Sequence, residues 1–238
     1  MRTSLMKKTI LLLAPLALVT LLAAPVSANA AATRYVTVNA EGTVKVAPDA
    51  VRLITTVSVV AATSKEALAQ TSATAAAVRK VLIAAGISTK DIATQNITVY
   101  PEYKYDNNGG STLAGYRGSQ QFNVVIRAAS SAGTVVDAVV TAGGDSLQVN
   151  SVSPFLLDAA KAAESARAVA VKNAKAKATS YAKLLGVKLG RVNYLTENGS
   201  PSISVPVMAA TAKSESDATV VDLGQQDVTV SITVQWAL

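Results

Sequence analysis

The alternation of apolar and polar residues predicts β-strands in several parts of the chain. Segments 34–46 and 51–60 alternate with a period of two and are rich in Val and Thr, with the turn sequence APDA between them. Segments 91–105 and 115–127 predict a second pair of strands, and the Asn and Gly residues of the loop between them favour a hairpin. Segment 227–238 has the cleanest alternation, with one apolar face: Val228, Val230, Ile232, Val234 and Trp236.

Two segments have the spacing of three and four residues that is typical of an amphipathic helix. The first follows Thr63, which forms a capping-box pattern with Glu66, and it ends at Gly86 in a left-handed cap. Its predicted apolar face is Leu68, Thr71, Ala75, Val78, Leu82 and Ala85. The second is short, stops at Gly143-Gly144 and carries Val135, Val136, Val139 and Val140.

A third, longer helix is predicted from Asp158, its cap, to Gly186, and it is rich in Ala and Lys. Its apolar stripe is Ala163, Ala166, Ala170, Ala174, Ala178, Tyr181, Leu184 and Leu185. The opposite side carries Lys161, Lys172, Lys175 and Lys183. A stripe of small residues lets a helix pack closely on a sheet, so we interpret the lysines as a solvated face and not as a nucleic-acid surface.

Two further strands, at 146–155 and 191–197, complete the order β-β-α-β-β followed by α-β-α-β-β. This order predicts an α+β fold with mostly antiparallel sheet built from strand-helix-strand units, and with the long Ala-rich helix packed on the sheet. Segment 198–219 is polar, contains Pro and Ser and has no period, which predicts a flexible loop.

The N-terminal segment 1–30 has the pattern of a secretory signal peptide. A basic start precedes an uncharged apolar run, and small residues follow it, with cleavage predicted near Ala28 or Ala30. The alternative is an uncleaved membrane anchor, but Pro15 and Pro25 bracket an apolar core that is short for a span of about 20 residues. We therefore expect residues 31–238 to form a secreted or periplasmic protein with no transmembrane span after cleavage.

Charge and composition narrow the function classes further. The precursor has a net charge of +7, and three of its 22 basic residues lie in the signal peptide, so the remaining 19 against 15 acidic residues give +4. A secreted chain of modest charge meets little nucleic acid. Cys and His are both absent, which removes thiol and His-dependent catalysis and nearly every zinc, copper or iron site.

The remaining candidates for catalysis are weak. Glu41 and Asp49 flank the first predicted turn and could act as an acid–base pair on a glycoside, but nothing in the sequence fixes their separation. The sequence has no Gly-rich phosphate-binding motif. We therefore predict no enzyme activity, no cofactor and no metal site.

Four of the seven Tyr residues lie on or beside the second predicted hairpin. Arg117 and Lys104 lie among them, and exposed Tyr with interleaved basic residues is typical of a protein contact or a ligand surface. The alternative is cross-strand aromatic pairing that stabilises the hairpin. The four are Tyr100, Tyr103, Tyr105 and Tyr116.

Arg167 and Lys177 lie within or beside the Ala stripe of the long helix. A basic group on a buried face must find a carboxylate, a carbonyl or a subunit boundary, because an unpaired buried charge costs several kcal/mol. One alternative is a partner in the same chain or a position at the helix flank. The other is contact with a neighbouring subunit or an anionic ligand.

Several segments together resemble the SIMPL-domain family of bacterial envelope proteins. They are GTVKVAPDAVRL, AAGISTKDIATQNITVYPEYKY, GYRGSQQFNVVIR, ARAVAVKNAKAKATSYAKLLGVKLGRV and VTVSITVQWAL. The most specific are the stretch from Gly86 to Asp91-Ile92-Ala93-Thr94 and the helix carrying Arg167 and Lys177. Where the family usually has Gly-x-Gly near its first turn, this chain has Asn39-Ala40-Glu41-Gly42.

The resemblance implies an exported, non-enzymatic envelope protein that assembles with itself, in some members as a ring, and that is linked to envelope or oxidative stress. It supplies no catalytic residues. The alternative is a binding module for a cell-wall glycan, peptide or lipid, with the Tyr-rich hairpin as its contact surface. We therefore predict a homo-oligomer, with envelope components as the alternative partners.

Overall fold

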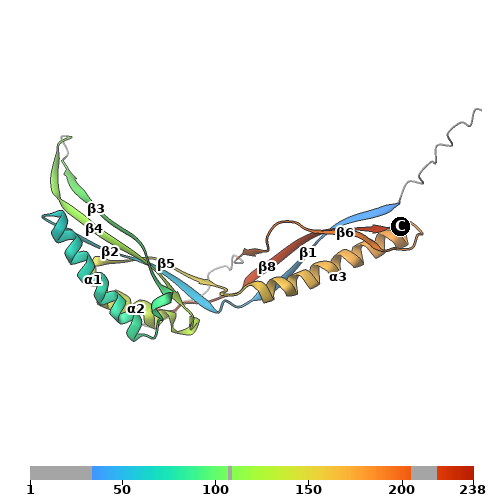
Figure 1. Cartoon of the computed structure of the whole chain (residues 1–238), viewed down its shortest axis with the longest axis horizontal. Coiled ribbons are helices and arrows are strands. Elements are labelled where there is room, and N and C mark those ends of the chain that lie inside the picture. The colour runs from blue at the N-terminus through green and yellow to red at the C-terminus, as the bar shows by residue number, and fades with distance from the viewer. Residues whose placement is uncertain (1–33, 107–108, 205–218) are drawn as a thin grey trace, which may run out of the picture. The chain divides into compact units, whose positions relative to one another are not determined.

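The computed structural model describes residues 34–106, 109–204 and 219–238. The predicted signal peptide and its cleavage site lie outside these residues, as does most of the predicted loop 198–219. Within the described residues there are three α-helices and eight strands, whose bounds are β1 (Tyr35–Val46), β2 (Ala50–Ala61), α1 (Ser64–Ala84), β3 (Ile92–Tyr105), β4 (Ser111–Ile126), α2 (Ala132–Gly143), β5 (Leu147–Phe155), α3 (Ala160–Leu184), β6 (Val192–Glu197), β7 (Ser202–Ser204) and β8 (Gln226–Ala237) (Figure 1).

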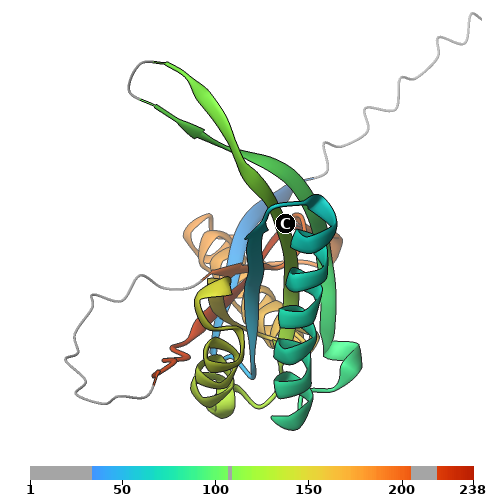
Figure 2. The ribbon, with the colours of Figure 1, turned by 90° about the vertical axis from the view of Figure 1, so that its left-hand side faces the viewer.

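The strands form two antiparallel sheets, which confirms the α+β class. Sheet A has the order β1-β8-β6, and the short strand β7 also pairs with β8. Sheet B has the order β3-β4-β2-β5. Each sheet has helices on one face: α3 packs on sheet A, and α1 and α2 pack on sheet B, where they lie side by side (Figure 2).

The first two strands do not pair with each other, although the sequence places only a short turn between them. β1 pairs with β8 along its whole length, and β2 lies between β4 and β5 in the other sheet. The connecting Ala47-Pro48-Asp49 lacks the Asn-Gly type of residues that a tight hairpin turn requires. The connection therefore carries the chain from one sheet into the other.

Sheet B and its helices enclose a core of large aliphatic residues and one Phe. The odd-numbered residues of β2 and the even-numbered residues of β4 supply it, including Leu53, Val57 and Phe122, and α1 adds Val78 and Leu82. The capping of α1 by Thr63 is confirmed, because the Thr63 side chain accepts a hydrogen bond from the Glu66 amide at 3.2 Å. The left-handed conformation of Gly86 is also confirmed.

The predicted apolar face of α1 is wrong at its two ends. Leu68 is 40% exposed, Ala85 is also exposed, and the first buried residue of the helix is Ala67. A spacing of four from Thr71 leads back to Ala67, whereas a spacing of three leads to Leu68, and the sequence contains an apolar residue at both positions.

Sheet A and α3 enclose a core in which the helix contributes only Ala. The buried residues of α3 are Ala162, Ala163, Ala166, Ala170, Ala174, Ala178 and Ala182. From Ala162 onward they repeat every four residues, so the contact follows the i±4 ridge, which is inclined to the helix axis by about 26°. The prediction that Tyr181, Leu184 and Leu185 continue the buried stripe is therefore wrong, and Leu184 is 80% exposed.

The predicted lysine face of α3 agrees with the structure, but the predicted cap does not. The N-cap of α3 is Ala159, which makes no side-chain capping hydrogen bond; Asp158 lies one residue before it and accepts a hydrogen bond from the Ala160 amide at 2.8 Å. All four lysines predicted for the opposite side are exposed. None of the helices in the described part of the chain has the length and apolar character to cross a membrane.

Candidate interaction surfaces

The seven residues predicted as interface or ligand candidates fall in two separate places. Tyr100, Tyr103, Tyr105, Tyr116 and Arg117 lie on the β3–β4 hairpin of sheet B, and Arg167 and Lys177 lie on α3 against sheet A. The sequence had already placed the first five on the second predicted hairpin and the other two on the long helix, and the structure agrees with both placements.

The end of the β3–β4 hairpin extends beyond the helices that cover sheet B (Figure 2). Tyr103 is 47% exposed and Tyr105 is 80% exposed, and Leu113, the register partner of Tyr103, is 52% exposed. An aromatic side chain that becomes buried removes roughly 150–250 Å² from water, so these exposed side chains offer apolar area to a partner. We name Tyr103, Tyr105 and Leu113 the hairpin patch.

The alternative interpretation of the Tyr residues, in which they stabilise the hairpin as cross-strand aromatic pairs, requires Tyr residues opposite one another, and the register does not place them so. Tyr100 lies opposite Arg117, Pro101 lies opposite Tyr116, and Tyr105 lies opposite Ser111. The aromatic side chains of the hairpin therefore do not pair directly across the strands.

Arg117 is held within the chain. Its Nη2 donates to Glu102 Oε1 at 2.6 Å, its Nε lies 2.6 Å from Glu102 Oε2, and its Nη1 donates to Ser58 Oγ at 3.1 Å. The hydrogen bond to Glu102 raises the pKa of Arg117. The guanidinium fixes β2, β3 and β4 to one another on the face of sheet B that lacks helices. Glu102 was not predicted, although its position in the same hairpin was a usable signal.

Arg167 and Lys177 also have partners within the chain. Arg167 forms a bidentate pair with Glu197 at the end of β6, with N–O distances of 2.7 and 3.0 Å. Hydrogen bonding to Arg167 lowers the pKa of Glu197. Lys177 Nζ donates to the backbone carbonyl of Asn39 at 3.2 Å. These contacts correspond to the alternative in which each basic residue pairs inside its own chain.

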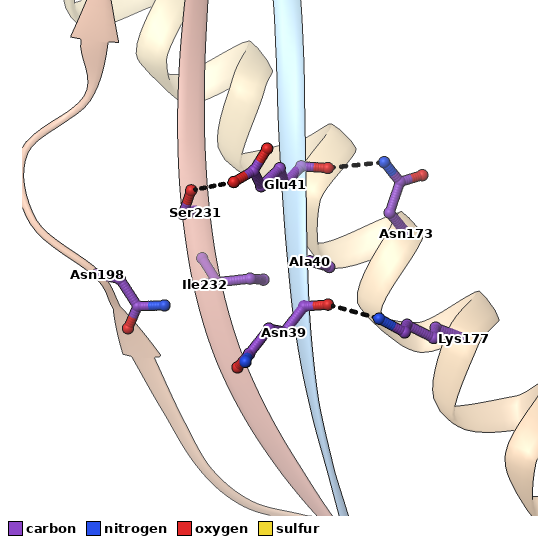
Figure 3. Close-up of a pocket in the computed structure, with 8 residues that line it drawn as sticks. All are labelled: Asn39, Ala40, Glu41, Asn173, Lys177, Asn198, Ser231 and Ile232. Atoms are coloured by element: carbon purple, nitrogen blue, oxygen red, sulfur yellow. Dashed lines mark hydrogen bonds between the residues drawn. The ribbon is translucent and has the colours of Figure 1, made fainter.

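Lys177 and Asn173 cover part of the free edge of sheet A. Asn173 Nδ2 donates to the carbonyl of Glu41 at 2.8 Å, one turn of α3 before the contact between Lys177 and Asn39 (Figure 3). β1 is an edge strand, and unpaired edge carbonyls are sites where another strand can add. The two side chains therefore block strand addition in the middle of β1.

An open cleft of about 610 Å³ lies over this region of sheet A. Most of the residues that line the cleft are polar, with Glu41 and Ser231 joined by a hydrogen bond of 3.1 Å and Asn39 pointing towards Asn198 (Figure 3). The bond between Glu41 and Ser231 is one of five cross-strand side-chain hydrogen bonds, here called the polar ladder, on the face of sheet A opposite α3. The five pairs are Thr37–Gln235, Asn39–Thr233, Glu41–Ser231, Thr43–Thr229 and Lys45–Asp227.

The possible acid–base pair of Glu41 and Asp49 does not form a site. Glu41 takes part in the ladder, whereas Asp49 Oδ1 accepts a hydrogen bond from the Leu157 amide at 2.8 Å. Each carboxylate thus has a separate structural partner. Among the described residues, no three acidic side chains are grouped so as to hold a metal ion.

The geometry defines a class: an α+β protein of two antiparallel sheets, each with helices on one face and a polar face opposite. Residues 36–236 match the model of the SIMPL family, which is described as a protein of unknown function (DUF541). The chain belongs to the SIMPL family.

Curated relatives cover most of the same region. The chain is 31% identical over 180 residues to the 26 kDa periplasmic immunogenic protein of Brucella melitensis, covering 72% of this chain and 70% of the relative. It is 30% identical over 181 residues to the uncharacterized protein YggE of Escherichia coli K12, covering 75% of this chain and 72% of the relative.

Proposed function

We propose that this protein is an exported, non-enzymatic protein of the cell envelope that assembles into a homo-oligomer through the hairpin patch. The observation that carries the proposal is the exposure of Tyr103, Tyr105 and Leu113 at a hairpin end that none of the helices in the described residues covers. Tyr is enriched at protein interfaces because it combines a large apolar area with a polar hydroxyl group.

Envelope location is supported by two observations. The N-terminal segment has the pattern of a secretory signal peptide. The Brucella relative, 70% of whose length aligns with this chain, is named a periplasmic protein. A non-enzymatic role is supported by the separate structural partners of Glu41 and Asp49. Protection of the envelope under stress, including oxidative stress, belongs to the same proposal.

The mass of residues 31–238 in solution tests assembly, measured by light scattering after size exclusion. We expect a discrete oligomer for the wild type and a much smaller mass for the double variant Tyr103→Ser/Tyr105→Ser. Tyr194→Ser is the matched control, because Tyr194 is 45% exposed but lies on β6 of the other sheet. A monomeric wild type would contradict the proposal.

The second candidate is a binding module for an envelope glycan, peptide or lipid, with the same hairpin as its contact surface. Lys104 is exposed and lies between the two Tyr residues along β3, so the opposite face of the same hairpin end carries a positive charge. If the double variant keeps its mass but is no longer retained on isolated cell envelopes, this second function is favoured over assembly. If the variant changes neither property, the patch has neither role.

A further inference from the structure

A second groove lies in sheet B, between α1 and the edge strand β3, and it is separate from the hairpin patch. Its volume is about 340 Å³. Ala75, Ile92 and Phe122 form its apolar part, and Phe122 is almost fully buried. The groove thus has an apolar floor at the edge of the core of sheet B, of which Ile92 is the more exposed part.

The groove exists because small residues on α1 lie opposite an irregular part of β3. Ser72 and Ala76 are four residues apart, so they lie on one side of the helix, next to the buried row. The register between β3 and β4 shifts between Thr94 and Asn96, as it does at a β-bulge. A bulge in an edge strand bends that strand locally, and the short side chains of α1 leave the space beside it unfilled.

Arg79 lines this groove and is partly buried, yet it makes no hydrogen bond or ion pair with any residue in the described part of the chain. By contrast, Arg117, Arg127 and Arg167 each form a close pair with a carboxylate. A partly buried guanidinium is a strong donor with a planar arrangement that matches a carboxylate.

The other polar groups of the groove are suited to an anion as well. Gln120 Nε2 donates to Thr94 Oγ1 at 3.4 Å, which leaves the Thr94 hydroxyl proton available to a ligand. The Ser72 hydroxyl is a further donor on the α1 side. No Asp or Glu lines the groove, so the charge that Arg79 brings is not compensated there.

The apolar surface continues from the groove along β3. Ile97 is the register partner of Gln120 and is 53% exposed. Since a water molecule occupies about 30 Å³ of liquid, the groove has room for about ten non-hydrogen atoms. A ligand of this size would place its acidic group at Arg79 and its apolar part over Phe122 and Ile97.

We propose that this groove binds a small amphipathic carboxylate, with its carboxylate on Arg79 and the hydroxyl groups of Ser72 and Thr94 beside it. A medium-chain fatty acid and the C-terminus of a short apolar peptide share this chemistry. The site lies away from Tyr103 and Tyr105, so it does not depend on assembly, and a failure here leaves the proposed oligomer intact.

Calorimetric titration of residues 31–238 with sodium octanoate at pH 7 tests the site. We expect saturable binding with one site per chain. Octanol and inorganic phosphate should not bind in this way, because octanol lacks the carboxylate and phosphate lacks the apolar chain. Arg79→Gln is expected to weaken binding about tenfold or more, since a charge-assisted hydrogen bond is lost. Lys80→Gln is the matched control, because it removes the same charge from the next, exposed residue of α1.

A second variant and a second ligand complete the test. Ala76→Leu keeps Arg79 but fills the groove, and we expect it to abolish binding while the circular dichroism spectrum stays unchanged. An apolar tripeptide with a free C-terminus, compared with its C-terminal amide, distinguishes a peptide source from a lipid source. The proposal is overturned if neither octanoate nor the free tripeptide binds, or if Arg79→Gln and Lys80→Gln bind equally well.

Discussion

The two sheets have the same layer arrangement but are packed in different ways. In sheet B, α1 and α2 contribute Val and Leu side chains that fill the space between helix and sheet. In sheet A, α3 contributes only Ala, and the bulky residues come from the sheet, such as Ile232 and Trp236. One helix layer is held by side-chain volume, the other by close approach of the backbones.

A glycine marks a close contact between a helix and a strand in each sheet. A Cβ atom on Gly42 of β1 would overlap the backbone of Ala166 and Ala170 in α3. A Cβ atom on Gly118 of β4 would lie 2.6 Å from Thr71 Oγ1 and 2.7 Å from the Ala67 carbonyl oxygen in α1. In sheet B this close approach is limited to the start of α1, where the helix also carries Ala, before larger side chains separate the layers.

We therefore expect the loss of side-chain volume to destabilise the packing on sheet B, and added volume to destabilise the packing on sheet A. Leu82→Ala is expected to have the largest effect, a loss of about 2–5 kcal/mol in the free energy of unfolding, because Leu82 is fully buried in the aliphatic core. Chemical denaturation measures this loss. Leu68→Ala is the matched control on the same helix, and since Leu68 is exposed it should change stability little; equal losses for both would contradict the assigned face of α1.

Gly42→Ala tests the close contact in sheet A. Alanine normally favours a strand over glycine, yet here we expect a loss of about 1–3 kcal/mol, because the added methyl group must push α3 away from β1. The same denaturation experiment measures it. Thr43→Ala adds no volume towards α3 and serves as the control. A stabilised Gly42→Ala variant would show that α3 does not approach β1 this closely.

The ion pairs of the two sheets should differ in their response to acid. Beside sheet B, where Asp91 directly precedes β3 and Arg127 directly follows β4, the hydrogen bond from Arg127 lowers the pKa of Asp91, whose side chain is only 7% exposed. In sheet A the corresponding carboxylate, Glu197, is 29% exposed. A lowered pKa in the folded state stabilises the protein above the carboxyl's ordinary pKa, and the stabilisation is lost as the pH falls through the lowered value.

We therefore expect Asp91→Asn to destabilise the protein at pH 7 more than Glu197→Gln does. The difference between wild type and Asp91→Asn should narrow as the pH falls below about 4, the ordinary pKa of an Asp side chain. Thermal unfolding from pH 7 to pH 3 measures both effects. A difference that is constant with pH would mean that the pair with Arg127 is not what makes Asp91 important.

The smallest effect is expected on the polar ladder of sheet A. The hydroxyl groups of Thr43 and Thr229 hydrogen-bond across the strands at 2.8 Å on the face opposite α3. Thr43→Val/Thr229→Val keeps the shape and the strand propensity, so we expect a change below about 1 kcal/mol. A larger loss in denaturation would show that the polar face, and not only the Ala-rich core, holds sheet A together.

The sequence alone determined the local features of this protein. Period-two alternation located the long strands, Thr63 and Gly86 located the ends of α1, and the Ala stripe identified a helix that packs closely. These features depend on residues within a few positions of one another, so they can be recognised in the sequence. The start of β4 was an exception: it begins at Ser111, inside the segment predicted as the hairpin loop, because the strand continues without an apolar pattern there.

The tertiary structure decided which strands pair and how far each buried face extends. β1 pairs with β8 from the opposite end of the chain, not with its neighbour β2, and this choice depends on contacts that no local pattern encodes. The same holds for the partners of Arg117 and Arg167. It also holds for the exposure of Leu184, because contact with sheet A decides which residues of α3 are buried. The groove at Arg79, which has no partner among the described residues, likewise arises only where α1 meets the irregular edge of β3.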